Sequence, residues 1–173
     1  IREINSIIKD DCVITDLSPI KEKIIKEVVK YDTLKRVYIS SIPLVLNRSS
    51  FLNDSAKELA QNCVILSPLP NTKENVVKKV KFFWNILKVK VVEMDYRRAD
   101  KTITAINHLP SILLLALFET ILEFSNYQQN VFELWGNNFK LIREIILGDP
   151  SICDNILLHN KANVIEFISR IKD

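Results

Sequence analysis

The pattern of apolar residues changes near Asp95, and this change limits what the chain can fold into. Before it, short apolar runs typical of buried strands alternate with segments that are apolar at helical spacing. The expected strands are 12–16, 36–40, 62–66 and 90–94, and the expected helices are 1–8, 18–29 and 73–87. Strands that alternate with helices predict an α/β fold with a largely parallel sheet.

After Asp95 the strand signals end and only helical patterns follow. The expected helices are 96–107, 111–124, 127–147 and 150–171, separated by Pro110 and by the break at 148–150. We therefore predict two domains, an α/β domain over residues 1–95 and an all-helical domain over residues 96–173.

Polar residues at the expected helix starts predict how the helices of the first domain are capped. Ser18 can cap the helix after it, with Pro19 at the first position, where no amide hydrogen is needed. Thr72 can cap the long helix 73–87. The residues expected to face inward from that helix are Val76, Val80, Phe83 and Trp84. Residues 43–61 are expected to be irregular, with a short helix at 54–60.

The run Ile112–Phe118 is apolar around the whole circumference of a helix. It is far shorter than the roughly 20 residues of a membrane span, so we expect no membrane insertion. A helix of this kind is buried on all sides, which a small bundle achieves with difficulty. We therefore expect a homodimer through the helical domain, with burial against the α/β domain as the alternative.

The composition points away from several classes of function. The net charge is only +3 and the lysines are scattered, so no nucleic-acid partner is expected. The densest group, Lys78, Lys79 and Lys81, is expected to be a solvated helix face rather than a phosphate site. The three cysteines lack metal-ligand spacing, so we expect no metal and reduced thiols. Without a secretory leader at its start, the protein is expected in the cytoplasm or an organelle stroma, and not secreted.

His108 is the strongest single candidate for chemistry. The polar pair Asn107-His108 stands directly before Leu109 and Pro110, where two helices are expected to meet. In one interpretation its imidazole faces a cleft at the domain junction and binds or polarises a substrate oxygen. In the other it is a helix-end histidine that is hydrogen-bonded to the backbone. The second histidine, His159, is expected to be exposed.

Five short motifs follow one another along the chain. They are Thr15-Asp16-Leu17-Ser18-Pro19-Ile20-Lys21, Tyr38-Ile39-Ser40-Ser41-Ile42-Pro43, Ile65-Leu66-Ser67-Pro68, His108-Leu109-Pro110 and the aromatic-led segment from Phe139 to Asp149-Pro150. This ordered series resembles the prephenate and arogenate dehydrogenase family, which oxidises the last prearomatic intermediates of tyrosine synthesis. An aspartate-led helix at Asp100 occupies the place that the family gives to one. The resemblance covers nearly all 173 residues.

The resemblance implies that residues 1–95 are the rear half of a Rossmann-like nucleotide-binding domain, and that the helical domain serves substrate binding and dimerisation. It implies NAD or NADP as cofactor, with Thr15 and Asp16 as the contacts from this chain. The glycine-rich turn that would receive the pyrophosphate is missing, because the only glycines are Gly136 and Gly148. We therefore expect most of the cofactor-binding region outside this chain, which would be the rear portion of a longer protein or a remnant of one.

The resemblance also implies a site for a small-molecule substrate. His108 and Ser18 are the expected catalytic residues, and the expected substrate-binding residues are Ser40, Ser41 and Arg143. Ser40, Ser41 and Ile42 are expected to form one wall of this site, opposite His108.

Three working positions depart from the family pattern. The family histidine that takes the proton from the substrate hydroxyl aligns with Ile42, and isoleucine cannot accept a proton. The serine that orients this histidine aligns with Pro19, and the arginine that holds the substrate carboxylate aligns with Glu144. Ser18 and Arg143 are the adjacent residues of the right chemistry, although one helical step turns a side chain by about 100°.

Three hypotheses follow from these residues. In the first, the chain belongs to an active NAD(P)-dependent dehydrogenase. In the second, it is an inactive relative that keeps the fold and the dimer as a binding or regulatory scaffold. In the third, it is a related dehydrogenase with another substrate, in which Ser40, Ser41 or Lys21 takes a new role.

Overall fold

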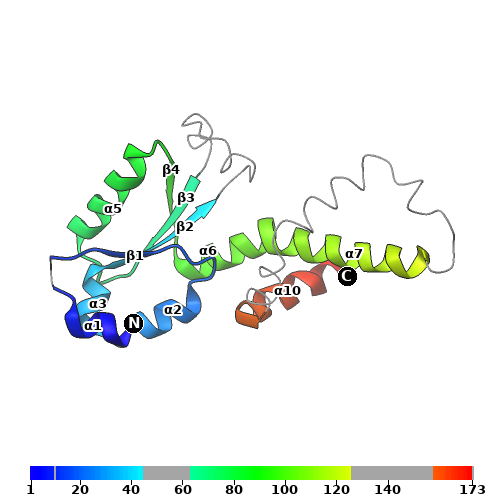
Figure 1. The fold of residues 1–173 in the computed structure, drawn as a ribbon, viewed down its shortest axis with the longest axis horizontal. Coiled ribbons are helices and arrows are strands. Elements are labelled where there is room, and N and C mark those ends of the chain that lie inside the picture. Colours follow the sequence, from blue (N-terminus) through cyan, green and yellow to red (C-terminus); the bar gives the residue numbers. More distant parts are fainter. Residues whose placement is uncertain (10, 45–62, 126–157, 173) are drawn as a thin grey trace. The chain divides into compact units, whose positions relative to one another are not determined.

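A computed structural model of the chain describes residues 1–9, 11–44, 63–125 and 158–172. The chain forms two compact units, Ile1–Asp100 and Lys101–Asp173. The first unit contains the strands and the second contains helices, which confirms the expected fold class (Figure 1). The predicted boundary between residues 95 and 96 lies close to this division and remains a prediction.

The first unit alternates helices and strands along the chain. Its elements are α1 Arg2–Ile7, β1 Ile14–Asp16, α2 Glu22–Val28, α3 Asp32–Val37, β2 Tyr38–Leu44, β3 Cys63–Pro68, α5 Glu74–Ile86, β4 Lys90–Glu93 and the start of α6 Tyr96–Ile103. The short helix α3 was not expected, because residues 36 and 37 were assigned to a strand. They end the helix instead, and β2 begins at Tyr38.

The four strands form one sheet in the order β1-β2-β3-β4. The outer pairs β1–β2 and β3–β4 are parallel, as expected, whereas the central pair β2–β3 is antiparallel. In that central pair Ser40 lies opposite Ser67, and Ile42 lies opposite Ile65. The prediction of a largely parallel sheet is therefore correct for two of the three pairings.

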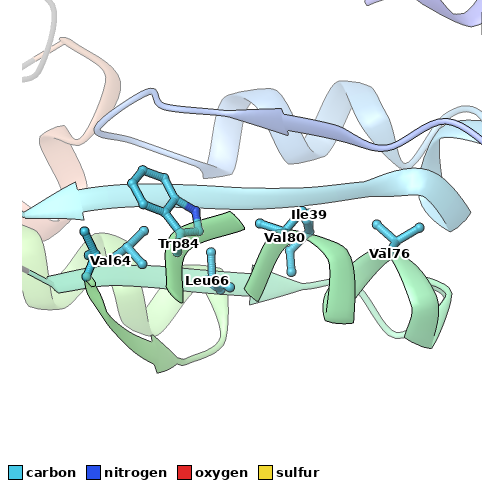
Figure 2. Close-up of a cluster of buried hydrophobic side chains, with 7 residues drawn as sticks. Ile39, Val64, Leu66, Val76, Val80 and Trp84 are labelled. Carbon is cyan, nitrogen blue, oxygen red and sulfur yellow. The ribbon is translucent and has the colours of Figure 1, made fainter. Parts of the chain in front are cut away.

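Helix α5 covers one face of the sheet and forms the larger apolar core (Figure 2). This cluster consists of Ile39, Val64, Leu66, Val76, Val80, Trp84 and Val89. The three buried residues of α5 recur every four positions, which is the spacing of one helix face. The prediction that Phe83 also faces inward is wrong, because it is 52% exposed. Phe83 is one helical step away from the buried stripe.

The opposite face packs against α2 and α3. Its buried cluster is Ile25, Val28, Leu34, Tyr38 and Leu69, with Tyr96 of α6 partly buried against it. Because side chains alternate along a strand, Tyr38 lies on this face while Ile39 lies on the α5 face. The sheet is thus covered on both sides, as in other α/β proteins.

Two predicted helix caps are wrong. Helix α2 begins at Glu22 with Lys21 as its N-cap residue, so Ser18 and Pro19 lie in the preceding loop. The hydroxyl of Thr72 caps no helix: it accepts a hydrogen bond from the Leu69 amide and donates one to the Tyr38 carbonyl, each at 2.9 Å. Thr72 thus links its loop to β2, while Ser18 makes a local contact in which its amide donates to Asp16 Oδ2.

In the second unit, α6 runs into α7 Leu109–Ser125 through a π-helical turn, η2 Thr104–His108. The expected break at Pro110 does not occur. The Leu109 amide donates to the Thr104 carbonyl five residues back, which widens the helix just before the proline. This wider turn accommodates the proline ring, which in a regular helix would clash with the carbonyl of residue 106.

The continuous helix Tyr96–Phe124 is 29 residues long, and its most apolar window has a mean hydropathy of 1.6, with only 6% of that window buried. By length and composition alone it can cross a membrane, which the expectation of no membrane insertion did not anticipate. A single helix of this kind is weak evidence for a membrane span, because the mostly buried core helix of a soluble protein passes the same test. In the part of the chain that is described, Leu113 and Leu117 of this helix are exposed.

The last described helix is α10 Lys161–Lys172, which also exposes apolar residues, namely Ile165, Ile168 and Ile171. The ion pair between Lys101 and Glu166, at 2.7 Å, joins α6 to α10. The helix predicted at 127–147, the break at 148–150 and the short helix at 54–60 lie outside the described residues.

Candidate functional site

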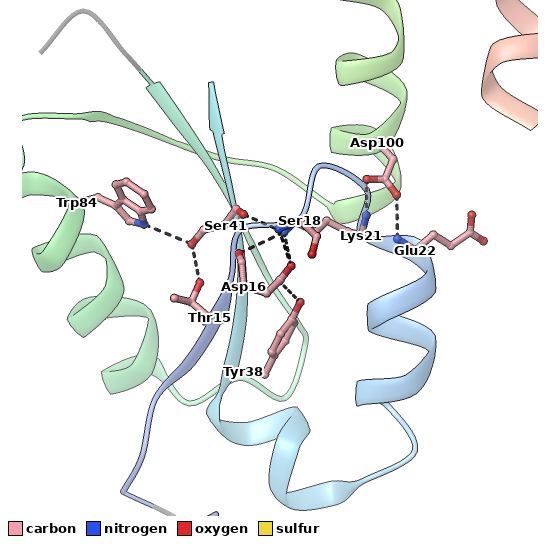
Figure 3. Close-up of polar contacts among 9 residues, drawn as sticks. All are labelled: Thr15, Asp16, Ser18, Lys21, Glu22, Tyr38, Ser41, Trp84 and Asp100. Atoms are coloured by element: carbon pink, nitrogen blue, oxygen red, sulfur yellow. Dashed lines mark hydrogen bonds and ion pairs between the residues drawn. The ribbon is translucent and has the colours of Figure 1, made fainter. Parts of the chain in front are cut away.

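The loop Asp16–Lys21 begins at the last residue of β1 and takes part in a network of polar contacts (Figure 3). Lys21 anchors it: this side chain is fully buried, although lysine is almost never buried unless it is paired. Its Nζ lies 2.7 Å from Asp16 Oδ2 and donates to the Ser41 carbonyl at 2.8 Å. A third bond reaches the Asp16 carbonyl at 3.3 Å. The ammonium group therefore ties the loop to the end of β1 and to the middle of β2.

Both oxygens of the Asp16 carboxylate accept hydrogen bonds from protein groups. Tyr38 donates its hydroxyl to Oδ1 at 2.5 Å, and the Ser18 amide donates to Oδ2 at 3.0 Å. Burial raises the pKa of Tyr38 well above its ordinary value, with the Asp16 charge acting in the same direction. Burial lowers the pKa of Lys21, while the charge of Asp16 opposes this effect. The pair is consequently a buried structural ion pair, and Tyr38 is a hydrogen-bond donor rather than a base.

Asp100 reaches the same loop from α6. Its Oδ1 accepts a hydrogen bond from the Lys21 amide and its Oδ2 accepts one from the Glu22 amide, each at 2.9 Å. These are the amides at the start of α2, which lack partners within that helix. Burial raises the pKa of Asp100, and the two amide bonds oppose that rise.

Thr15 and Ser41 lie on the α5 side of the sheet. Their hydroxyl oxygens are 2.7 Å apart, and Trp84 donates its indole Nε1 to Ser41 Oγ at 3.3 Å. Ser41 is fully buried, whereas Thr15 is exposed at the carboxyl end of β1. The side chain of Ser41 is thus used in joining β1, β2 and α5.

Ser40 and Ile42 lie on the other face, because neighbouring residues of a strand alternate. The prediction that Ser40, Ser41 and Ile42 form one wall is therefore wrong, since Ser41 points to the opposite side. Ser40 Oγ and the cross-strand Ser67 Oγ are both buried, and neither has a hydrogen-bond partner among the described residues. Whether Ser40 or Ser41 binds substrate remains a prediction.

His108 ends the π turn in the second unit and is 4% exposed. Burial lowers the pKa of its imidazole to about 4, so the ring is neutral at pH 7. Its Nδ1 has no hydrogen-bond partner in the described structure. The side chain of Asn160, next to α10, donates to the hydroxyl of Thr104, so a buried polar contact joins α10 to the start of the same turn. His159 is exposed, as predicted.

Of the residues that the sequence assigned to cofactor binding and catalysis, Asp16 and Ser18 are joined by the bond from the Ser18 amide to the Asp16 carboxylate, whereas the hydroxyl of Thr15 lies against Ser41 on the α5 side. Arg143 lies outside the described residues, as does Glu144. No group of three or more metal-ligating side chains occurs in the part of the chain that is described. The sequence analysis missed the roles of Tyr38, Asp100 and Asn160. The aspartate-led helix drew attention to Asp100, but no residue near it in sequence indicated that its partners are the amides of Lys21 and Glu22.

Two sequence profiles of one family match the chain in succession. The profile "Prephenate dehydrogenase, nucleotide-binding domain" matches residues 1–93, and "Prephenate dehydrogenase, dimerization domain" matches residues 97–172. Together they account for nearly the whole chain, in the order in which the α/β unit and the helical unit occur.

Individual relatives agree with these profiles. The prephenate dehydrogenase of Bacillus subtilis (strain 168) is 23% identical over 160 residues, which is 92% of this chain and 43% of that protein. The prephenate dehydrogenase from A. aeolicus, solved in complex with hydroxyphenyl propionate and NAD+, superposes with a TM-score of 0.85 at 24% identity, over 98% of this chain and 59% of that one. The Synechocystis arogenate dehydrogenase gives a TM-score of 0.76 at 15% identity, over 98% and 61%.

The chain therefore spans less than two thirds of the length of these relatives, and the structural matches show a shared fold. The two profiles cover both units with domains of one kind of enzyme. On this basis the chain belongs to the prephenate dehydrogenase family.

Proposed function

We propose that the protein to which this chain belongs is an NAD(P)-dependent dehydrogenase that acts on prephenate or arogenate in tyrosine biosynthesis. The observation that carries the proposal is the succession of the nucleotide-binding and dimerization profiles along residues 1–93 and 97–172. No feature of the described structure favours an inactive scaffold over an enzyme.

The loop Asp16–Lys21 suits a position beside the cofactor. It lies at the carboxyl end of β1, and ligands of α/β sheets bind outside the carboxyl ends of the strands. Thr15 is exposed there and can contact the cofactor directly. Both carboxylate oxygens of Asp16 are taken by Lys21, Tyr38 and Ser18, so Asp16 shapes the loop. When bound, the nicotinamide ring supplies the carbon that accepts a hydride from the substrate.

His108 suits a role as a neutral hydrogen-bonding group for a substrate oxygen. Its burial keeps the imidazole uncharged at neutral pH, and its Nδ1 is not used by the described protein. Ile42 is buried and cannot take the proton of a substrate hydroxyl. General base catalysis typically contributes about 10²- to 10⁴-fold in rate, so we expect slow turnover unless another group acts as the base.

The helical unit suits a homodimer. The dimerization profile spans residues 97–172, and α7 and α10 expose leucines and isoleucines that water does not favour. A second copy would cover the long helix without a membrane. Cys12 and Cys63 are free thiols, which supports a location in the cytoplasm or an organelle stroma.

The test is an assay of cofactor reduction with prephenate and with arogenate, each with NAD and NADP, on the longest natural form of the protein. We expect slow turnover of one substrate, and thermal stabilisation by that substrate because it binds the folded state. His108→Gln should lower turnover by about tenfold or more, whereas the exposed control His159→Gln should leave it within about twofold. Absence of both turnover and stabilisation with all four combinations would refute the proposal.

A further inference from the structure

Asp100 makes an unusual contact for a residue inside a helix. Its carboxylate is buried, with the residue 2% exposed, and each oxygen accepts one backbone amide of α2 from a position 78 or 79 residues away in sequence (Figure 3). A carboxylate is the side chain that can accept two such bonds at once without offering a donor in return.

Helix α2 has no cap of its own. No side chain of its N-cap residue Lys21 bonds the first turn, so Asp100 provides that contact. Helix α6, by contrast, is capped locally: Asp95 Oδ1 accepts from the Arg97 amide at 2.9 Å and from the Arg98 amide at 3.4 Å, in an exposed position. Both aspartates therefore accept hydrogen bonds from amides at the start of a helix. Asp100 does so for α2, which is distant in sequence, and Asp95 does so for α6, which begins directly after it.

The two hydrogen bonds of Asp100 complete a network of polar contacts around the loop Asp16–Lys21. At one end of the loop, Asp16 holds the Ser18 amide and the Lys21 ammonium group. At the other end, Asp100 holds the Lys21 amide. The loop is thus fixed to Asp100, in the part of α6 that belongs to the first unit.

We propose that Asp100 is a positioning residue for the proposed dehydrogenase reaction, because its two amide bonds set the conformation of the Ser18-bearing loop relative to α6. The proposal rests on the proposed function. It assigns Asp100 no contact with substrate or cofactor: the residue acts through the loop.

A change of Asp100 to asparagine separates positioning from stability. Asparagine keeps the shape and one acceptor oxygen but turns an amide donor toward the second backbone amide, so one of the two bonds is lost. It also removes a buried charge, whose desolvation opposes folding. These effects on stability oppose each other, while the loop geometry loses a constraint outright. Asp95→Asn is the matched control, since asparagine caps a helix about as well as aspartate does.

The experiment compares the unmodified protein with D100N and D95N in its longest natural form. It measures kcat and KM with the active substrate, the melting temperature, and amide hydrogen exchange at residues 17–22. We expect D100N to lower kcat by about tenfold, with KM for the cofactor within about twofold and a melting temperature close to that of the unmodified protein. Amide exchange should speed up at residues 17–22 in D100N and stay unchanged there in D95N.

A normal kcat in D100N would overturn the inference. It would also be overturned if D95N lost as much kcat and as much melting temperature as D100N. If the unmodified protein turns over neither substrate, the proposed function fails, and amide exchange alone then decides the inference. Faster exchange confined to residues 17–22 in D100N, without a fall in melting temperature, would support the positioning role. Unchanged exchange would overturn it.

Discussion

Replacing Lys21 by methionine tests whether the buried ion pair with Asp16 holds the first unit together. Methionine fills most of the volume of the lysine stem but removes the ammonium group. The change deletes the 2.7 Å ion pair with Asp16 and the 2.8 Å bond to the Ser41 carbonyl. It leaves the Asp16 carboxylate with two of its partners, the hydroxyl of Tyr38 and the amide of Ser18.

The expected loss follows from what remains unpaired. Breaking a buried ion pair by removing one partner typically costs about 3–5 kcal/mol. The Asp16 side chain is 20% exposed and keeps two hydrogen bonds, so the expected loss of stability is smaller than for a fully buried pair. Methionine also avoids the cost of burying an ammonium group. We therefore expect K21M to lower the free energy of unfolding by about 2–4 kcal/mol, and the double variant D16N/K21M to recover about 1–2 kcal/mol of it.

The assay is urea unfolding followed by the fluorescence of Trp84, in a Trp135→Phe background. Trp84 belongs to the core of the first unit, so its signal reports on that unit even if the two units unfold separately. The control is K26M, which breaks the exposed ion pair of Lys26 with Glu22 on α2 and should cost less than about 1 kcal/mol. A loss in K21M no larger than in K26M would refute the assigned role of the buried pair, as would a double variant less stable than K21M.

Three further predictions concern the two units. Burial lowers the pKa of His108 in the folded protein to about 4, below its ordinary 6.5, so the folded protein should lose up to about 3 kcal/mol of stability as the pH falls from 6.5 toward 4. The free energy of unfolding, measured against pH, should show this fall. The fall should be absent in H108Q and kept in H159Q. Sedimentation at micromolar concentration should give twice the 20.0 kDa chain mass, and L113K/L117K should give monomer; a monomeric unmodified chain contradicts the dimer. Ile42→His should raise turnover by about tenfold or more by supplying a base, and unchanged turnover would show that residue 42 is not at the reacting group.

The periodicity of apolar residues predicted the strands of the first unit and the buried stripe of α5 well. Val76, Val80 and Trp84 are inward because every fourth residue of a helix shares a face. The same reasoning failed at Phe83, whose bulk suggested burial although its angular position lies outside the stripe. It also failed at Pro110, where a π turn absorbed a residue that usually ends a helix.

The candidate site was predictable only in part. The sequence identified the loop with Asp16 and Ser18, and it singled out His108 in a buried turn. It placed Ser40 and Ser41 on one wall, although strand alternation alone separates them. Local capping rules chose Ser18 for α2, whereas the protein uses a carboxylate from α6.

The sequence by itself determined the division into an α/β unit and a helical unit, because strand and helix periodicities are local properties that neighbouring residues impose. Only the tertiary structure decided how polar groups are satisfied. The partners of Lys21 and Asp100 come from β2 and α2, up to 79 residues away, and no periodicity encodes such a pairing. Buried amides and charges must find partners wherever the fold supplies them, and the chain meets that requirement across the sheet and between helices.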